Sequence, residues 1–360
     1  MKRFALAMRN VAGSSLVVAL LCAPLLTRLG AQTERRSVSG DRVAIYNLAG
    51  RLRVQSGTGS DVIVEITRGG HDASQLKLAT GTVRGAQTLR VIYPSDRIVY
   101  SDMNHRSRTT LQVNDDGTFD DDNGRDSFGR SRVEIRDSGS GLEAHADLVV
   151  SVPKGQRAAV HWGVGEATVA NVDGDLYVSV GSGSLSSEHT RGVLSLDTGS
   201  GGLTVTDAQG DVRLDAGSGG VSVTGVHGDG LDVDAGSGSV RGSDIDVKTL
   251  KVDVGSGGLR LDRVKAPRVD VDAGSGRTDL ELLTPVEHLG VDAGSGGVSV
   301  RLPSSQGADV DIETGSGGID SDFSIQTTRV ERNRVRGKIG DGRGSIKIEA
   351  GSGGVRLIKG

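Results

Sequence analysis

One tripeptide, Gly-Ser-Gly, recurs through the second half of the chain at nearly constant spacing, and it restricts the possible folds more than any other feature. Its first glycines are Gly181, Gly199, Gly217, Gly236, Gly255, Gly274, Gly294, Gly315 and Gly351, and the variant Gly163-Val164-Gly165 precedes them. From Gly163 onward the steps are 18, 18, 18, 19, 19, 19, 20, 21 and 36 residues. A period near 20 residues is typical of stacked repeats. The double final step predicts one degenerate repeat.

Each repeat contains two alternating segments, one on either side of the tripeptide. Examples are Leu231-Asp232-Val233-Asp234-Ala235 before it and Val298-Ser299-Val300 after it. Strict alternation is the pattern of a half-buried strand, so each repeat should hold two short strands joined through the Gly-Ser-Gly turn. A further apolar column, nine residues after each first glycine, predicts a second inward-facing corner. Its members are Val172, Thr190, Ala208, Val226, Ile245, Val264 and Leu283.

The composition fits a thin core. The 360 residues include 56 glycines but just four Phe, four Tyr and one Trp, and aliphatic side chains suit a narrow space between two close walls. We therefore predict an all-β, single-chain β-solenoid with about 18–21 residues and two main strands per rung. Parallel crossovers favour right-handed coiling. The glycines should permit positive φ at each corner, and the lone Trp162 should plug the core at the first rung.

The beginning of the chain resembles a secretory signal peptide. Residues 1–31 combine a basic start (Lys2, Arg3, Arg9), an apolar stretch and the small-residue exit Gly30-Ala31. An uncleaved anchor is the alternative, although Pro24 interrupts an already short apolar stretch. We expect an exported protein found in the periplasm, on the outer cell surface or outside the cell. Cys22, the single cysteine, lies within the leader, so no disulfide is expected.

The rest of the chain divides into two regions in this prediction. Residues 32–144 should form an irregular N-terminal β region or cap, with a polar loop insertion at about 101–141. Residues 145–360 should form the Gly-Ser-Gly solenoid. The acids within 101–141 lack the spacing of an EF-hand, so a mobile surface loop is expected there.

An acidic residue stands before the corner of almost every repeat. The column is Asp197, Asp215, Asp234, Asp253, Asp272, Asp292, Glu313 and Glu349. Two charges about 4.8 Å apart repel by about 0.9 kcal/mol in water. The next outward column, Arg213, Asp232, Lys251 and Asp270, alternates in sign and could relieve this repulsion. The ladder is interpreted either as a solvated acidic face or as a row of weak divalent-cation sites, with candidate ligands Asp215, Asp234, Asp253, Asp272 and Asp292.

Basic residues cluster in the degenerate repeat. Arg329, Arg332, Arg334 and Arg336 are either a solvated face or a docking site for an acidic partner. Removing residues 1–31 takes away four of 42 basic residues and none of 46 acidic ones, so the net charge changes from −4 to −8. An acidic exported chain argues against a nucleic-acid partner.

The sequence contains none of the common catalytic motifs. The sequence has no Gly-x-Ser-x-Gly elbow, no Walker A motif and no His-Glu-x-x-His, and its seven histidines share no column. We therefore predict no catalytic residues, no cofactor and no enzymatic activity.

The chain resembles a bacterial putative-adhesin family of Gly-Ser-Gly β-strand-repeat proteins, a domain of unknown function. The resemblance rests on the period from 163 to 317, the entry Leu148-Val149-Val150-Ser151-Val152-Pro153-Lys154-Gly155, the exit Lys338-Ile339-Gly340-Asp341-Gly342 and the last Gly351-Ser352-Gly353. It covers 145–360 well and the start at 43–50 loosely. It implies an exported β-repeat protein and no catalytic residues.

These observations lead to one main functional expectation and two alternatives. The main expectation is a non-enzymatic adhesin or cell-envelope scaffold and binding module. The alternatives are a carbohydrate-binding or polysaccharide-cleaving solenoid, and an envelope regulatory interaction module. A cell-surface protein or a polysaccharide is the candidate partner. The last repeat runs to Gly360 without an obvious cap, which predicts an exposed strand edge and end-to-end self-association.

Overall fold

The described part of the chain is built almost entirely of β-strands. The computed structural model describes residues 33–119 and 129–360, so the leader expected at 1–31 lies outside the described residues. Within them there is one 3-10 turn, η1 (Ala73–Gln75), and no α-helix. None of these residues forms a helix that is long and apolar enough to cross a bilayer. The strands form a 27-stranded, mostly parallel sheet and a separate four-stranded sheet, which confirms the all-β prediction.

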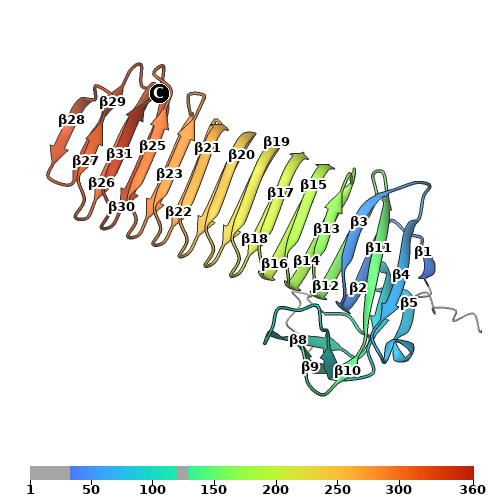
Figure 1. Cartoon of the computed structure of the whole chain (residues 1–360). Coiled ribbons are helices and arrows are strands. Elements are labelled where there is room, and N and C mark those ends of the chain that lie inside the picture. Colours follow the sequence, from blue (N-terminus) through green and yellow to red (C-terminus); the bar gives the residue numbers. More distant parts are fainter. Residues whose placement is uncertain (1–32, 120–128) are drawn as a thin grey trace, which may run out of the picture.

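The large sheet winds into an elongated solenoid with two walls (Figure 1). The first wall contains β2 (Arg42–Ala49), β5 (Lys77–Val83), β6 (Ala86–Ile92), β12 (Arg157–Val164), β14 (Asp175–Ser182), β16 (Leu194–Ser200), β18 (Val212–Ala216), β22 (Arg268–Ala273), β24 (His288–Ala293), β26 (Ala308–Thr314), β28 (Gln326–Glu331), β29 (Arg334–Ile339) and β30 (Gly344–Ala350). The second wall contains β1 (Thr33–Val38), β3 (Leu52–Gly57), β4 (Val62–Gly69), β11 (His145–Pro153), β13 (Ala167–Ala170), β15 (Leu185–Arg191), β17 (Leu203–Gln209), β21 (Leu259–Lys265), β23 (Thr278–Leu282), β25 (Val298–Leu302), β27 (Ile319–Ser321) and β31 (Val355–Lys359). Two long strands, β19 (Val221–Ala235) and β20 (Val240–Val254), pass from the second wall to the first.

Parallel pairing joins equivalent positions of successive repeats. In the first wall Leu176 pairs with Leu194, and Leu194 with Val212. In the second wall Leu185 pairs with Leu203, and Leu203 with Val221. Each backbone therefore finds its hydrogen-bond partners one repeat away, which is why a single repeat could not fold alone.

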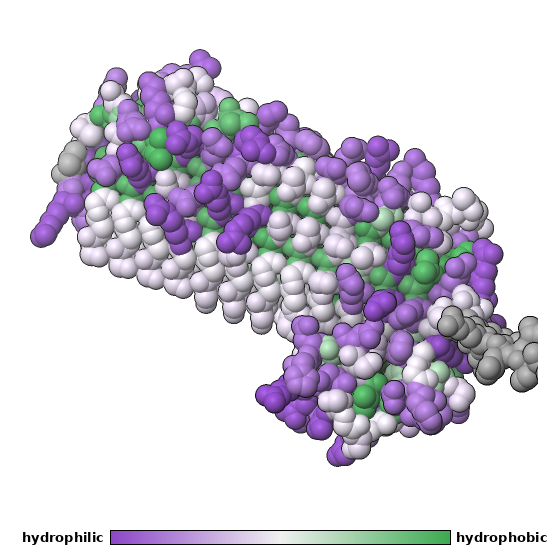
Figure 2. All heavy atoms as spheres, viewed as in Figure 1, coloured by the Kyte–Doolittle hydropathy of each residue, from purple (hydrophilic) through white to green (hydrophobic). Residues whose placement is uncertain are grey.

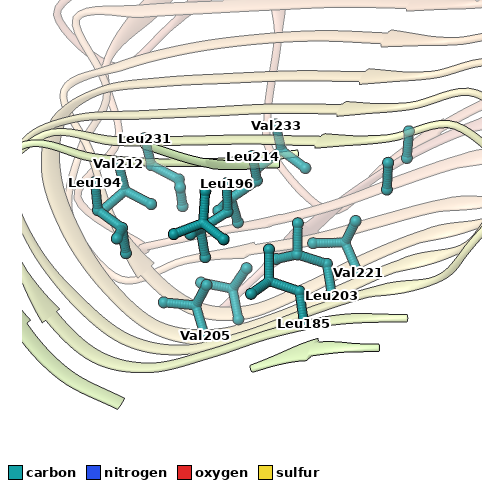
Figure 3. Close-up of a cluster of buried hydrophobic side chains, with 14 of the residues drawn as sticks. Leu185, Leu194, Leu196, Leu203, Val205, Val212, Leu214, Val221, Leu231 and Val233 are labelled. Carbon is teal, nitrogen blue, oxygen red and sulfur yellow. The ribbon is translucent and has the colours of Figure 1, made fainter. Parts of the chain in front are cut away.

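The core lies between the walls and is made of aliphatic ladders. Figure 3 shows Leu194, Leu196 and Leu214 of the first wall facing Leu185 and Leu203 of the second, and all five are buried. Trp162 of β12 is also fully buried, and its indole Nε1 donates a hydrogen bond of 2.9 Å to the carbonyl oxygen of Gly50. The tryptophan is thus a core residue, but the expectation of a plug at the first rung was wrong, because β2 and β6 extend the stack beyond β12.

Close stacking, more than turn conformation, explains the third glycine of each Gly-Ser-Gly. A Cβ at Gly219 would lie 1.5 Å from the carbonyl oxygen of Gly201, and a Cβ at Gly238 would lie 1.8 Å from that of Gly219. The expected positive φ occurs at the early corners, with 144° at Gly183 and 142° at Gly201, but not at Gly219 or Gly238. The expectation of a positive φ at every corner was therefore wrong, because the neighbouring coil, and not the turn, excludes a side chain in the later repeats.

The second corner contains one left-handed residue in most repeats. The series is Asn171, His189, Asp207, Gly225, Asp244 and Arg263, with φ between 52° and 72°. This residue shifts the alternation of inward and outward side chains by one place. The predicted inward column from Val172 to Val264 is therefore buried. No such residue occurs in β23, so the alternation continues and Leu282 points inward. Leu283, expected in the core, is 45% exposed.

The N-terminal end is more regular than predicted. β12 pairs in parallel with β2 (Val160 opposite Ile45), and β13 pairs with β3 (Val169 opposite Val54). Residues 42–57 therefore form a repeat of the main stack, and they are not an irregular coil or cap. Antiparallel strands close this end, because β5 pairs with β6, and β4 pairs with both β1 and β11.

A small second sheet lies beside the N-terminal repeats (Figure 1). It contains β7 (Arg97–Val99), β8 (Arg108–Asn114), β9 (Arg130–Arg136) and β10 (Leu142–Glu143). β8 and β9 are antiparallel, and they occupy much of the segment 101–141 that was expected to be a mobile loop. Apolar and polar residues alternate within Arg108–Asn114 and within Arg130–Arg136. The polar composition of the whole segment hid this strand pattern. Asp120, Asp121, Asp122 and Asp126 lie outside the described residues.

The C-terminal end departs from the order of the sequence. β30 lies between β24 and β26, and β31 lies between β25 and β27 (Figure 1). The segment expected to hide a degenerate repeat forms β27 and the antiparallel hairpin β28–β29, and β29 pairs antiparallel with β26. The last strand of the chain is therefore enclosed on both sides, and the expectation of an exposed edge at Gly360 was wrong.

Candidate binding face

The acidic residues picked out in the sequence form one continuous ladder on the outside of the first wall. Asp197 pairs with Asp215, which is followed in register by Asp234, Asp253, Asp272 and Asp292. Asp292 then pairs with Glu349, and Glu349 with Glu313, because β30 is inserted between β24 and β26. The ladder thus contains eight carboxylates on successive strands. We call it the acidic ladder.

A second outward column compensates part of this charge. Arg213, Asp232, Lys251 and Asp270 are in register, as predicted, and the column continues through Gly290, Lys347, Asp311 and Arg336. Arg213 forms an ion pair of 2.9 Å with Asp232, and Lys347 forms one of 2.7 Å with Glu349 of the ladder. Signs therefore alternate along this column, apart from Gly290, whereas the acidic ladder keeps one sign throughout.

Burial and neighbouring charges shift the pKa of two side chains on this face. Partial burial raises the pKa of Asp234, and the neighbouring carboxylates Asp215 and Asp232 raise it further. The pKa of Lys347 is also raised, because Glu349 binds its ammonium group and Asp311 and Asp292 lie nearby.

A shallow groove of 470 Å³ lies between the acidic ladder and the alternating column. Gly290 leaves a place without a side chain in this groove, between Asp270 and Lys347. The groove is lined by Asp232, Asp234, Lys251, Val252, Asp253, Asp270, Val271, Asp272, Gly290, Val291, Asp292, Lys347 and Glu349. Carboxylates repeated at strand spacing can accept hydrogen bonds from an extended ligand that carries repeated donors.

Sequence reasoning missed an aromatic cluster that continues the ladder toward the N-terminus. Tyr46, His161, Ser179 and Asp197 are successive members of the same outward column. The rings of Tyr46 and His161 stack with centroids 4.4 Å apart, and Phe119 packs edge-on against Tyr46 at 5.8 Å. Because β2 and β12 are far apart in sequence, no period could have brought Tyr46 and His161 together.

The four candidate arginines lie on the C-terminal hairpin. The Arg334 guanidinium donates to both carboxylate oxygens of Asp311, at 2.8 and 2.7 Å, and Arg336 donates to Asp311 at 3.0 Å. These hydrogen bonds lower the pKa of Asp311 to about 2. Arg329 pairs with Glu331, while Arg332 lies exposed at the hairpin turn. Most of this basic cluster thus neutralises acids of β26 and of the hairpin itself.

No group of three or more His, Cys, Asp or Glu side chains within 33–119 and 129–360 is arranged to hold a metal ion. The divalent-cation interpretation of Asp215, Asp234, Asp253, Asp272 and Asp292 therefore rests on the sequence pattern alone.

Fold and face together define a stacked-repeat, all-β protein with one uniformly acidic column on its first wall. The chain belongs to the Toastrack DUF4097 family, a domain of unknown function, which matches residues 106–357. Among solved structures, the chain is similar to a crystal structure described as a putative cell adhesion protein from Clostridium sporogenes ATCC 15579. The two share 11% sequence identity with a TM-score of 0.22, and the similarity covers 91% of this chain and 99% of that chain. Comparison with curated proteins gave no match.

Proposed function

We propose that this protein is an exported, non-enzymatic scaffold of the cell surface or envelope, and that it binds an extended partner along the acidic ladder. The observation that carries the proposal is the register of eight carboxylates on successive strands. A uniform row offers many equivalent contacts to a long partner, and multivalent contact gives strength without any single strong site.

Two further features support this proposal. Residues 1–31 have the pattern of an export signal. A catalytic site needs one irregular cluster with a nucleophile or a matched acid and base, whereas here the same acid repeats on each strand. We also propose that the solenoid is right-handed, because parallel crossovers are almost always so.

Binding to envelope material tests the proposal. Purified protein would be mixed with envelope fragments of the organism that makes it, and the retained fraction measured by sedimentation. The triple variant Asp234→Asn, Asp253→Asn, Asp272→Asn should weaken retention about tenfold, since three exposed charges contribute about 0.5 kcal/mol each. Adding 1 M salt should weaken retention in the same way, because screening shortens the reach of each charge.

The matched control removes the same charge from the second wall. Asp262→Asn, Asp279→Asn and Glu281→Gln lie on β21 and β23 and should leave retention unchanged. Equal losses in the two variants would contradict a role for the ladder.

The groove beside the ladder favours one second candidate, a carbohydrate-active protein. Glycosidases use paired carboxylates, and the groove is lined by several. Release of reducing ends from a panel of polysaccharides, lost in the ladder variant, would contradict the non-enzymatic proposal and support this one.

A further inference from the structure

The C-terminal repeat, β30 and β31, is inserted between two repeats that follow each other directly in sequence. Ile346 lies between Leu289 and Val310, and Ile348 lies between Val291 and Ile312. In the second wall, Leu357 lies between Val300 and Ser321. We call the space that this repeat fills the C-terminal slot. The slot separates β24 from β26, and β25 from β27, by the width of one additional strand.

One side chain fills the part of the slot that the inserted repeat does not reach. Gln306 is buried in the connection between β25 and β26. Its Oε1 accepts a hydrogen bond of 2.8 Å from the backbone N–H of Val286, and its Nε2 donates to the Val286 carbonyl at 3.2 Å. The side-chain amide therefore takes the place of a peptide group at this corner. β30 begins just beyond it, at Gly344.

The inserted repeat is connected to the rest of the chain by one short segment. The chain passes from β29 to β30 through Gly340-Asp341-Gly342-Arg343, with φ of 55° at Gly340 and 70° at Gly342. This segment lies so close to the residue before β26 that a Cβ at Gly307 would lie 1.9 Å from the Asp341 carboxylate. Within the described residues, the strands of this repeat pair with β24 to β27 and with no other strand.

The two sides of the slot present matching ladders. Leu289, Val291 and Ala293 of β24 stand in the same columns as Val310, Ile312 and Thr314 of β26. A glycine column also continues through it, since Gly351 stacks on Gly294, and Gly315 on Gly351. Any strand pair with the sequence of β30–β31 would make the same contacts, whichever chain supplied it.

We propose that the C-terminal slot accepts the C-terminal repeat of a second copy, so that two chains exchange residues 344–360 and form a swapped dimer. Exchange of an identical element re-forms the same strand contacts in the dimer, where only the short connection differs in conformation. The pairings of β30 and β31 with β24 to β27 must open during the exchange. The glycines at 340 and 342 allow this connection to extend. The proposal concerns the end of the solenoid and is independent of binding along the acidic ladder.

Disulfide trapping between two differently substituted full-length chains tests the exchange. Ser299 of β25 and Arg356 of β31 are register partners on the outer surface of the second wall. One chain would carry Ser299→Cys and the other Arg356→Cys, both with Cys22→Ser, and the equimolar mixture would be incubated below the unfolding transition and oxidised. At full exchange roughly half of the slots would hold a repeat from the other variant. A covalent heterodimer should then accumulate.

Two controls make the result decisive. Both cysteines in one chain should give an intrachain disulfide, which shows that the pair has suitable geometry. Thr204→Cys mixed with Ser222→Cys provides an equivalent register pair in the middle of the solenoid, and it should stay monomeric. A Ser299–Arg356 mixture that yields no more heterodimer than this control would overturn the proposal.

Hydrogen exchange supplies a second, independent measurement on the unsubstituted chain. The amides of β30 and β31 should exchange together and faster than those of β24 and β26 on either side. Gln306→Ala removes the amide that holds the corner and should speed this exchange further. Protection of β30 equal to that of β24 and β26 would show that the repeat does not open separately, and would contradict the proposal.

Discussion

At the scale of single residues, the narrow core requires small aliphatic side chains and tolerates few polar ones. Thr278 of β23 lies in the inward column between Leu259 and Val298. Its side chain is fully buried, and its hydroxyl has no hydrogen-bond partner within the described part of the chain. A buried hydroxyl without a partner costs about 1–3 kcal/mol.

Thr278→Val should therefore raise the free energy of unfolding by about 1 kcal/mol, because a methyl group of similar size replaces the hydroxyl. Urea denaturation followed by circular dichroism measures the change. Thr204→Val, on the outer surface of the same wall, is the matched control and should have little effect. A loss of stability in Thr278→Val would mean that the hydroxyl has a partner, such as a buried water molecule.

At the scale of strands, β29 stabilises the C-terminal end by placing arginines beside the acids of β26. The Arg334 and Arg336 guanidinium groups hold the pKa of Asp311 at about 2, below the ordinary value of 3.8. A carboxylate with a lowered folded-state pKa contributes stability above its unfolded pKa. That contribution is lost as the pH falls through the folded value.

Asp311→Asn should thus destabilise the protein by about 1 kcal/mol at pH 7, allowing for partial exposure of the side chain, and by less as the pH falls from 4 toward 2. Unfolding by urea at several pH values measures the difference between the two proteins. Asp309→Asn on the same strand is the control, since the Asp309 carboxylate is largely exposed and lies 3.8 Å from Lys338. A pH-independent difference for Asp311→Asn would contradict the assignment.

The acidic ladder should have the opposite pH dependence. Burial and the carboxylates of Asp215 and Asp232 raise the pKa of Asp234, so the charged form destabilises the folded state. This penalty is present above the folded pKa and disappears as the pH falls below the ordinary value of 3.8. Asp234→Asn should therefore increase stability at pH 7, within the range of about 0.2–1 kcal/mol for cross-strand pairs.

Salt distinguishes this electrostatic effect from packing. At 1 M salt the Debye length is about 3 Å, so the gain from Asp234→Asn should shrink. Asp262→Asn, on the second wall beside Arg260, should give no gain at either ionic strength. A gain that persists at high salt but disappears at low pH would assign the effect to burial of the charge and not to the neighbouring carboxylates. A gain that persists at low pH would argue for a steric cause.

At the scale of the whole molecule, the solenoid is a one-dimensional stack. Antiparallel strands close both walls at the N-terminal end and the first wall at the C-terminal end, where the second wall ends with the parallel strand β27. Contacts are made mainly between neighbouring repeats, so stability should also be local. Figure 2 shows a pale stripe along one long edge, as expected where the uncharged Gly-Ser-Gly corners stack, with charged side chains gathered elsewhere on the visible surface. Antiparallel and charged strands at the ends limit uncontrolled edge pairing.

Leu214→Ala should test this locality. Removing a fully buried leucine costs about 2–5 kcal/mol, and hydrogen exchange should show lost protection centred on β16 to β19 with little change at the ends. Leu280→Ala, another buried leucine, should move the loss to β21 to β25. Equal loss of protection along the whole chain in both variants would show that the stack unfolds as one unit.

Much of this architecture could be read from the sequence because the repeat encodes contacts between near neighbours. The Gly-Ser-Gly period predicted an all-β stack of repeats. The acid column predicted the register from Asp215 to Asp292 that the structure shows. Alternation also distinguished inward from outward side chains, except where β23 lacks the left-handed residue and Leu283 is exposed.

Only the tertiary structure decided which distant segments are neighbours. The pairing of β2 with β12, the aromatic contact between Tyr46 and His161, the second sheet and the insertion of β30–β31 all join segments outside the period. The physical reason is that a repeated pattern makes many strand pairs locally compatible. The choice among them depends on chain connections and end closure, which alternation does not encode.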